Sequence, residues 1–277
     1  MRSRGGDNPA PFSIPLPRKK LGLALSSGGA RGTAHIGVLK ALEEAGLSPA
    51  AIAGTSVGAW VGGCYAAGVP LEELARYWKE LRWYGVGRHL VPGPVWRGWT
   101  SGNSLLRAVK KLVGNVRIED LEIPFIAVAT DLVTGEAVWI RKGPLAEAIC
   151  ASGAVPGLVV PRPWNGRWLI DGGVVDPLPV EAVRSLGAEV VVAVDVLVCP
   201  AEKRFTSPNV FKVLFQMSTI FQKRISQLEA ETQRPDLLLQ PRFGPNPPRY
   251  ANIGRAVEVG YQEMRRHLPR LQELLGP

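Results

Sequence analysis

The residue that could most readily do chemistry in this sequence is Ser56, at the centre of Gly54-Thr55-Ser56-Val57-Gly58. The pentapeptide fits the G-x-S-x-G pattern of a nucleophilic serine on a sharp strand-to-helix turn, which needs a small residue on each side. The apolar run 51–55 predicts a strand before the serine, and the small residues after it predict a helix. A helix N-terminus at this point would favour negative charge on the serine oxygen. The alternative is an ordinary serine that caps a helix.

A serine nucleophile needs a general base, and the usual one is histidine. The chain has three histidines, His35, His89 and His267. The order Ser56, Asp171, His267 would allow a triad of the α/β-hydrolase kind. However, those enzymes place several strands before the strand–turn–helix elbow, and only one, 21–26, is predicted before it here. We therefore expect the histidines to be structural or superficial.

Asp171 is a second candidate base, because it lies in Ile170-Asp171-Gly172-Gly173, where a short hydrophobic run meets two glycines. A carboxylate can deprotonate a serine if burial raises its pKa and if the oxyanion formed after attack is stabilised nearby. The alternative is a simple turn, for which Asp-Gly-Gly is a common sequence.

An oxyanion site is available in the glycine-rich segment Ser27-Gly28-Gly29-Ala30-Arg31-Gly32. Gly28 and Gly29 can present backbone N–H groups to an anion, while Arg31 can hold the loop or stabilise charge. Dinucleotide binding is the alternative for such a turn. However, no acidic residue follows about 20 positions later, and no Gly-Lys-Ser/Thr makes it a P-loop.

The hydrophobic pattern predicts alternating strands and helices from Leu21 onward, which is typical of an α/β protein with a parallel sheet. Strands are predicted at 21–26, 51–55, 125–131, 137–141, 168–170 and 190–196, with an edge strand at 236–240. Helices are predicted at 33–45, after Ser56, from Leu71, around Leu105, at 144–152 and 179–186, at 210–228 and near the C-terminus. Residues 1–20, with four prolines, predict a flexible basic arm before one domain, 21–277, whose region from about 205 is helical.

The order of these motifs is more specific than any one of them, and it resembles that of the patatin-like phospholipase family. The resemblance runs from Leu21 to about Val198 through the Gly28–Gly32 segment, the Gly54–Gly58 elbow and Asp171-Gly172-Gly173. Softer similarity continues through 151–157 and 252–255. Ser27 departs from the family pattern, whose glycine-rich motif usually begins with glycine.

The resemblance implies a three-layer α/β/α fold with a mainly parallel sheet, and hydrolysis of lipid acyl esters through an acyl-enzyme. It implies that Ser56 is the nucleophile, that Asp171 is the base and that Gly28, Gly29 and Arg31 form the oxyanion loop. The motif glycines that support them are Gly32, Gly54, Gly58, Gly172 and Gly173. No metal or other cofactor is expected, because no His/Cys/Asp/Glu cluster has ligand spacing. Acyl transfer by the same dyad and nucleotide binding at 28–32 stay open as alternatives.

The formal net charge of +9 is concentrated at the two ends of the chain. Residues 1–20 carry a net +4 and residues 201–277 a net +5, so the 180 residues between them are neutral. This distribution argues against a nucleic-acid enzyme with a basic central groove, and it suits attraction to an anionic membrane surface. Solubilising tails are the alternative. The sequence shows no membrane span or signal peptide, which predicts a cytoplasmic protein. The basic ends add the expectation of a peripheral association with the inner face of the membrane.

Two segments could meet lipid. Aromatic residues crowd into 77–102 together with several glycines and prolines, which is typical either of a mobile flap or of a long loop pinned by its rings. The segment 210–228 predicts an amphipathic helix, with Leu214, Met217 and Phe221 on one face. That face either packs on the sheet or lies at a lipid interface. The cysteines Cys64, Cys150 and Cys199 are expected to be buried, reduced thiols.

Overall fold

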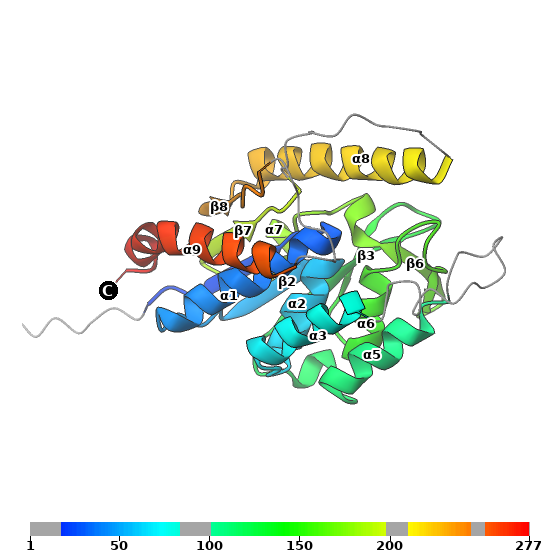
Figure 1. Cartoon of the computed structure of the whole chain (residues 1–277), viewed down its shortest axis with the longest axis horizontal. Coiled ribbons are helices and arrows are strands. Elements are labelled where there is room, and N and C mark those ends of the chain that lie inside the picture. Colours follow the sequence, from blue (N-terminus) through cyan, green and yellow to red (C-terminus); the bar gives the residue numbers. More distant parts are fainter. Residues whose placement is uncertain (1–17, 84–100, 198–209, 245–252, 277) are drawn as a thin grey trace, which may run out of the picture.

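The computed structural model describes residues 18–83, 101–197, 210–244 and 253–276, and the alternation of helices and strands can be followed in Figure 1. The strands are β1 Leu21–Leu25, β2 Ala51–Thr55, β3 Phe125–Asp131, β4 Ala137–Ile140, β5 Arg162–Trp164, β6 Arg167–Asp171, β7 Val190–Val194 and β8 Leu237–Leu239. The helices are α1 Ala34–Glu44, α2 Val57–Ala66, α3 Leu71–Trp83, α5 Asn103–Val113, α6 Leu145–Ser152, α7 Val180–Arg184, α8 Val210–Gln233 and α9 Ile253–Leu275. Short 3-10 turns are η1 Gly29–Thr33, η2 Ile118–Asp120 and η3 Gly172–Val174.

The strands form one sheet in the order β5-β6-β3-β2-β1-β7-β8, with β4 also paired to β3. Strands β3, β2, β1, β7 and β8 run parallel, whereas β4 and β6 are antiparallel to β3. The carboxyl ends of β1 and β2 therefore meet at one edge, with Leu25 in register with Gly54. The edge strand expected at 236–240 is β8, while β5 is a strand that the sequence pattern did not indicate.

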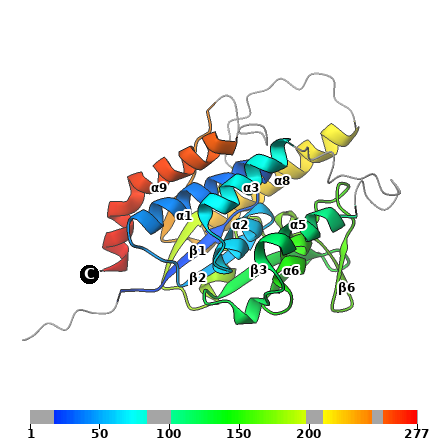
Figure 2. The ribbon, with the colours of Figure 1, turned by 60° about the horizontal axis from the view of Figure 1, so that its bottom comes forward.

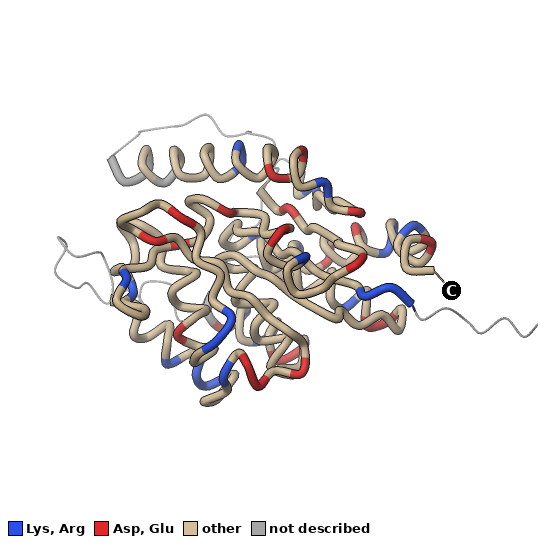
Figure 3. The backbone as a smooth tube through the Cα atoms, turned by 180° about the vertical axis from the view of Figure 1, so that it is seen from behind, with Lys and Arg blue, Asp and Glu red and all other residues tan. Residues whose placement is uncertain are grey.

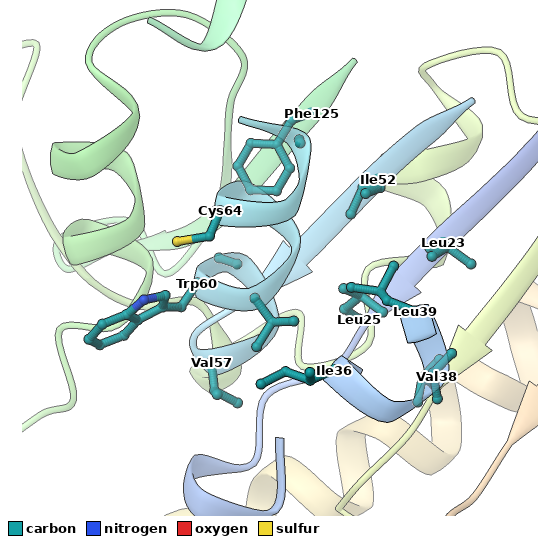
Figure 4. Packing of buried hydrophobic residues seen from close by; sticks show 14 of the residues in the cluster. Leu23, Leu25, Ile36, Val38, Leu39, Ile52, Val57, Trp60, Cys64 and Phe125 are labelled. Carbon is teal, nitrogen blue, oxygen red and sulfur yellow. The ribbon is translucent and has the colours of Figure 1, made fainter. Parts of the chain in front are cut away.

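Helices cover both faces of the sheet, so the expected three-layer α/β/α fold is confirmed. On one face β1, β2, β3 and β7 pack against α1, α2, α3, α5, α6 and α9. Figure 4 shows part of this core, where Ile36 and Leu39 of α1 and Trp60 and Cys64 of α2 lie over the strands. The other face is covered by α7, with Ala230 of α8 and Leu238 of β8 beside it.

Two of the crowded aromatic residues belong to this core rather than to a flap. Trp78 of α3 is buried, and its ring lies 4.9 Å from that of Trp60 on α2. The ring of Tyr77 lies 5.9 Å from the same Trp60. Of the other aromatic residues in this segment, Trp83 is the last residue of α3, while Tyr84, Trp96 and Trp99 fall outside the described residues. Cys64 and Cys150 are free and buried, as expected, and Cys199 also falls outside the described residues.

Helix α8 turns its polar side to the protein, which is the opposite of packing its apolar face on the sheet. Ser226 and Glu229 are buried, whereas Leu214, Met217 and Phe221 are exposed. The helix lies over the rest of the fold as a separate rod in Figure 1. Hydrogen bonds rather than a hydrophobic interface hold this helix to the body, as described below.

Helices α1 and α9 lie side by side, as Figure 2 shows, and their backbones approach closely at two glycines. A Cβ atom on Gly37 of α1 would strike the Val257 carbonyl of α9. A Cβ atom on Gly260 of α9 would likewise strike the Ala34 carbonyl of α1. The C-terminal helix is therefore fitted to the helix that follows the glycine-rich turn.

This contact predicts that Gly260→Ala destabilises the protein, because the added methyl group meets backbone that cannot move aside. We expect the free energy of unfolding to fall by about 1–3 kcal/mol. Gly254→Ala is the matched control on the same helix, since a Cβ there meets open space, and it should change stability by less than about 1 kcal/mol. Urea unfolding of both variants measures the difference, and equal stability of the two would contradict the close packing.

Candidate active site

Ser56 lies on a strained elbow between β2 and α2. Its backbone angles are φ 56° and ψ −118°, a conformation that residues other than glycine rarely adopt. The next residue already begins α2, which aims the positive end of the helix at the serine. A non-glycine residue held in this conformation is the backbone feature that the G-x-S-x-G pattern predicts.

The glycines of the elbow are needed for close approach. A Cβ on Gly54 would strike the backbone of Gly58, and a Cβ on Gly58 would strike the Leu25 carbonyl at the end of β1. The first turn of α2 therefore packs directly against the ends of two strands. Because the backbone is packed so tightly here, the elbow can hold its strained conformation.

The Ser56 hydroxyl is hydrogen bonded to the carboxylate of Asp171, with 2.6 Å between Oγ and Oδ2. Asp171 is the last residue of β6, and Ala129 of β3 is its partner in register. Since β3 also pairs with β2, the sheet brings together two residues that are 115 positions apart. Oγ donates and the carboxylate accepts, which is the arrangement required for proton transfer from serine to aspartate.

Asp171 is almost completely buried, and its second oxygen is held by the turn that follows. Oδ1 accepts a hydrogen bond of 2.8 Å from the Gly173 N–H, and Thr130 Oγ1 donates to the Asp171 carbonyl at 2.9 Å. Burial raises the pKa of the Asp171 carboxyl to about 6, against the hydrogen bonds from Ser56 and Gly173, which lower it. The carboxylate is therefore ionised at neutral pH and is more basic than an exposed aspartate.

The glycine-rich turn lies beside the elbow, because β1 and β2 are neighbours in the sheet. Gly28 has φ 151°, a conformation that favours glycine. The Arg31 Nε donates to the Gly28 carbonyl at 3.3 Å, so Arg31 folds back on its own loop. A Cβ on Gly32 would strike the side chain of Val57, the residue after Ser56. The structure therefore brings the predicted oxyanion loop against the predicted nucleophile.

Ser27, which departs from the family pattern, connects this loop to α8. The Ser27 hydroxyl donates to Gln222 Oε1 at 2.9 Å, and the Ser27 N–H donates to the Pro177 carbonyl at 2.9 Å. The Gln222 side chain also lies against Gly173, where a Cβ would come within 3.0 Å of its Oε1. One glutamine of α8 thus contacts both turns that flank the serine and the aspartate.

A second contact of α8 is made by Glu229, whose carboxyl accepts a hydrogen bond of 2.9 Å from the Leu178 N–H. Glu229 also interacts with Asp176, whose backbone carbonyl accepts from Thr55 Oγ1 at 2.8 Å. Burial and the neighbouring Asp176 raise the pKa of Glu229 above that of an exposed glutamate. This contact anchors the C-terminal part of α8 to the segment that precedes α7.

The described histidines do not take part in the serine–aspartate pair. His35 is fully buried, its Nε2 lies 2.9 Å from the Ser26 carbonyl, and burial lowers its pKa to about 4. His267 of α9 has its Nδ1 2.9 Å from the Glu263 carbonyl. Each of these rings therefore contacts a backbone carbonyl away from the Ser56–Asp171 pair. His89 falls outside the described residues.

Ser152 is a site residue that the sequence reasoning did not single out. It ends α6, and its hydroxyl accepts a hydrogen bond of 2.8 Å from the Ser56 N–H while donating to the Val128 carbonyl of β3. The residue lies in the segment 151–157, which carries only softer similarity to the family. Its role in fixing the elbow depends on a contact across 96 positions, which no local pattern shows.

Two further properties concern cofactors and membrane spans. Among the described residues, no group of His, Cys, Asp and Glu side chains is arranged to hold a metal ion. In the same part of the chain, no helix combines the length and apolar character that a membrane crossing requires.

The site is thus a serine–aspartate pair at the carboxyl edge of a mainly parallel sheet, in a three-layer α/β/α fold. The model of the family described as patatin-like phospholipase matches residues 23–184, which contain every motif residue discussed above. The chain belongs to the patatin-like phospholipase family.

Individual relatives agree with this assignment. An uncharacterized NTE family protein of Mycobacterium tuberculosis is 45% identical over 194 residues, which are 70% of this chain and 51% of that protein. The lysophospholipase nte1 of Emericella nidulans is 35% identical over 188 residues, covering 64% of this chain and 12% of that protein. The chain thus spans about half the length of the mycobacterial relative. The crystal structure of VipD from Legionella pneumophila shares the fold, with a TM-score of 0.51 and 17% identity over 92% of this chain and 68% of VipD.

The buried carboxyl predicts a pH-dependent effect of Asp171→Asn on stability. Because the pKa is raised from 3.8 to about 6 in the folded state, the carboxyl stabilises the fold at low pH. This contribution is lost as the pH rises through about 6. The asparagine variant has no such loss, so its stability relative to wild type should increase by about 1–2 kcal/mol between pH 5 and pH 8.

Urea unfolding of both proteins at the two pH values measures this difference. Asp120→Asn, at an exposed position, is the matched control and should leave the stability difference unaffected by pH. A constant or decreasing advantage of Asp171→Asn from pH 5 to pH 8 would show that the Asp171 carboxyl is not desolvated.

Proposed function

We propose that the protein is a serine hydrolase of lipid acyl esters, in which Ser56 is the nucleophile and Asp171 is the general base. The observation that carries the proposal is the 2.6 Å hydrogen bond from Ser56 Oγ to a buried carboxylate, at an elbow with φ 56°. Membership of the patatin-like phospholipase family supports an ester of a lipid as the substrate. The name of the Emericella nidulans relative adds lysophospholipids to the substrates that should be tested.

In the acylation step, Asp171 takes the proton of Ser56 as Oγ attacks the ester carbonyl carbon. The N–H groups of Gly28 and Gly29 and the N-terminus of α2 stabilise the negative charge that develops on the carbonyl oxygen. When the tetrahedral intermediate collapses, the bond to the leaving alcohol breaks, and the alcohol takes the proton from Asp171. The acyl group is then esterified to Ser56.

In the second step a water molecule gives a proton to Asp171 and attacks the acyl carbon. The intermediate is stabilised by the same loop, and its collapse returns the proton to Ser56 and releases the fatty acid. Only one titrating group is used, so the Asp171 carboxyl must be ionised before each attack. Arg31 holds the Gly28 carbonyl in this scheme and so positions the loop.

The basic ends of the chain support a peripheral interaction with anionic membranes, since each lysine or arginine near such a surface contributes about 1 kcal/mol. The arm, 1–20, lies mostly outside the described residues, while Arg266 and Arg270 on α9 form ion pairs with Glu263 and Glu273. We place the enzyme in the cytoplasm, on the inner face of the membrane, as part of this proposal.

Substitution of the pair should abolish turnover of a soluble short-chain ester. We expect Ser56→Ala and Asp171→Asn each to lower kcat by at least about 100-fold, because one removes the nucleophile and the other removes the base. His267→Gln is the control and should retain wild-type turnover. In the wild type, kcat/KM should fall about tenfold for each pH unit below about 6, as the Asp171 carboxyl becomes protonated. If a histidine variant were as inactive as Asp171→Asn, the result would contradict a serine–aspartate dyad and indicate a triad.

The products distinguish hydrolysis from acyl transfer. Diacyl phospholipids and lysophospholipids are incubated with the protein, with and without an alcohol acceptor, and the lipids are identified by mass spectrometry. We expect free fatty acid from the wild type in both conditions and from Ser56→Ala in neither. Acylated acceptor without free fatty acid would identify an acyltransferase instead.

A further inference from the structure

The large apolar side chains that remain exposed in the described residues come from two places only. One group lies on α8. The other consists of two residues that follow β3 and one residue of β6, which precedes Asp171 by three positions. The α8 residues are Val213, Leu214, Met217, Ile220, Phe221 and Leu228, and the others are Leu132, Val133 and Trp168. Such a concentration on an otherwise polar surface marks an interaction site.

Both groups are connected to the segments that carry Ser56 and Asp171. Phe221 is the neighbour of Gln222, which contacts Ser27 and Gly173 on one side of the pair. On the other side, Trp168 precedes Asp171 by three residues of β6, or about 10 Å of strand. The Leu132 N–H donates to the Trp168 carbonyl at 2.8 Å, which holds the two parts of this second group together. Figures 1 and 2 both show β6 and the N-terminal end of α8 at the same end of the molecule.

Hydrogen bonds of its polar residues fix the orientation of α8, and this orientation leaves the apolar side exposed. Gln222 binds the oxyanion loop, and Glu229 binds the Leu178 N–H and Asp176. A helix that uses its polar residues to attach itself and leaves its apolar residues outside is suited to a second, apolar environment.

The charges of α8 favour a lipid surface as that environment. Residues 210–228 contain three basic residues, Lys212, Lys223 and Arg224, and no acidic one. Between Val213 and Gln222 there is no charged residue. Figure 3 accordingly shows neither blue nor red on the coloured part of α8 that precedes its first blue segment. An exposed acidic residue, Glu231, follows only after Leu228. Apolar residues next to basic ones are typical of helices that lie on an anionic bilayer.

We infer that the part of α8 before Gln222, together with Leu132, Val133 and Trp168, docks the protein on a lipid surface on the side from which the substrate reaches Ser56. This inference rests on the proposed function, because a lipid ester would then pass from the bilayer to the serine without crossing water. A second copy of the chain seated on this face would cover the side from which, in this proposal, the substrate reaches Ser56. The docking surface is distinct from the basic arm, since it acts through apolar contact.

Vesicle binding by matched variants tests the inference. Phe221→Ser and Leu228→Ser remove side chains of nearly equal exposure, 57% and 58%, from the same helix. Only Phe221 is next to Gln222, the residue that contacts Ser27 and Gly173. Trp168→Ser tests the second group. All are made with Ser56→Ala, and binding to ether-linked phosphatidylcholine and phosphatidylglycerol vesicles is measured by co-sedimentation. The Ser56→Ala variants lack the proposed nucleophile, and ether-linked lipids have no acyl ester to cleave. The binding result is therefore independent of whether the protein hydrolyses esters.

We expect Phe221→Ser and Trp168→Ser each to weaken vesicle binding at least about fivefold, and Leu228→Ser by less than about twofold. The same substitutions with Ser56 intact should keep wild-type labelling by a soluble fluorophosphonate, which excludes misfolding as the cause. Wild-type binding by Phe221→Ser and Trp168→Ser, or an equal loss in all three variants, would overturn the inference. A dimer in light scattering that Phe221→Ser converts to a monomer would overturn it as well and assign the face to a second copy.

Discussion

The hydrogen bond between Ser56 and Asp171 is the interaction around which the fold is organised. It joins the turn after β2 to the end of β6, and its length of 2.6 Å depends on the intervening strand β3, which pairs with both. Each partner is held on its other side as well, Ser56 by the hydroxyl of Ser152 and Asp171 by the N–H of Gly173. The strand β3, the hydroxyl of Ser152 and the turn after β6 therefore hold the two side chains in place. Proton transfer between fixed groups requires such preorganisation.

This arrangement has an energetic cost, because the carboxylate is buried and the serine backbone is strained. Burial alone would make Asp171 a weak acid, and the hydrogen bonds from Ser56 and Gly173 return its pKa to about 6. The carboxylate is then ionised at neutral pH and still basic enough to accept a proton in the transition state. His35 contacts the Ser26 carbonyl just before the glycine-rich loop, and burial lowers its pKa to about 4, so it is neutral at pH 7.

Much of the fold and the principal residues of the site could be predicted from the sequence, because they depend on local patterns. The apolar runs gave strands such as β1 and β2, and the elbow and the Asp-Gly-Gly turn are defined by glycines next to the residues they serve. Ser152 and Gln222 could not be found in this way, since each acts through one contact between distant segments. The exposure of the apolar face of α8 was equally inaccessible, because periodicity shows that a helix has an apolar side but not which side meets the protein.

The account depends most directly on an acyl group becoming attached to Ser56 under the control of Asp171. Intact-mass spectrometry of the protein, quenched during turnover of a short-chain ester and followed by peptide mapping, measures this attachment. The account predicts one acyl group on the peptide that contains Ser56 in the wild type, and its absence in Asp171→Asn. An acyl group on any other residue, or unchanged acylation of Ser56 in Asp171→Asn, would contradict it.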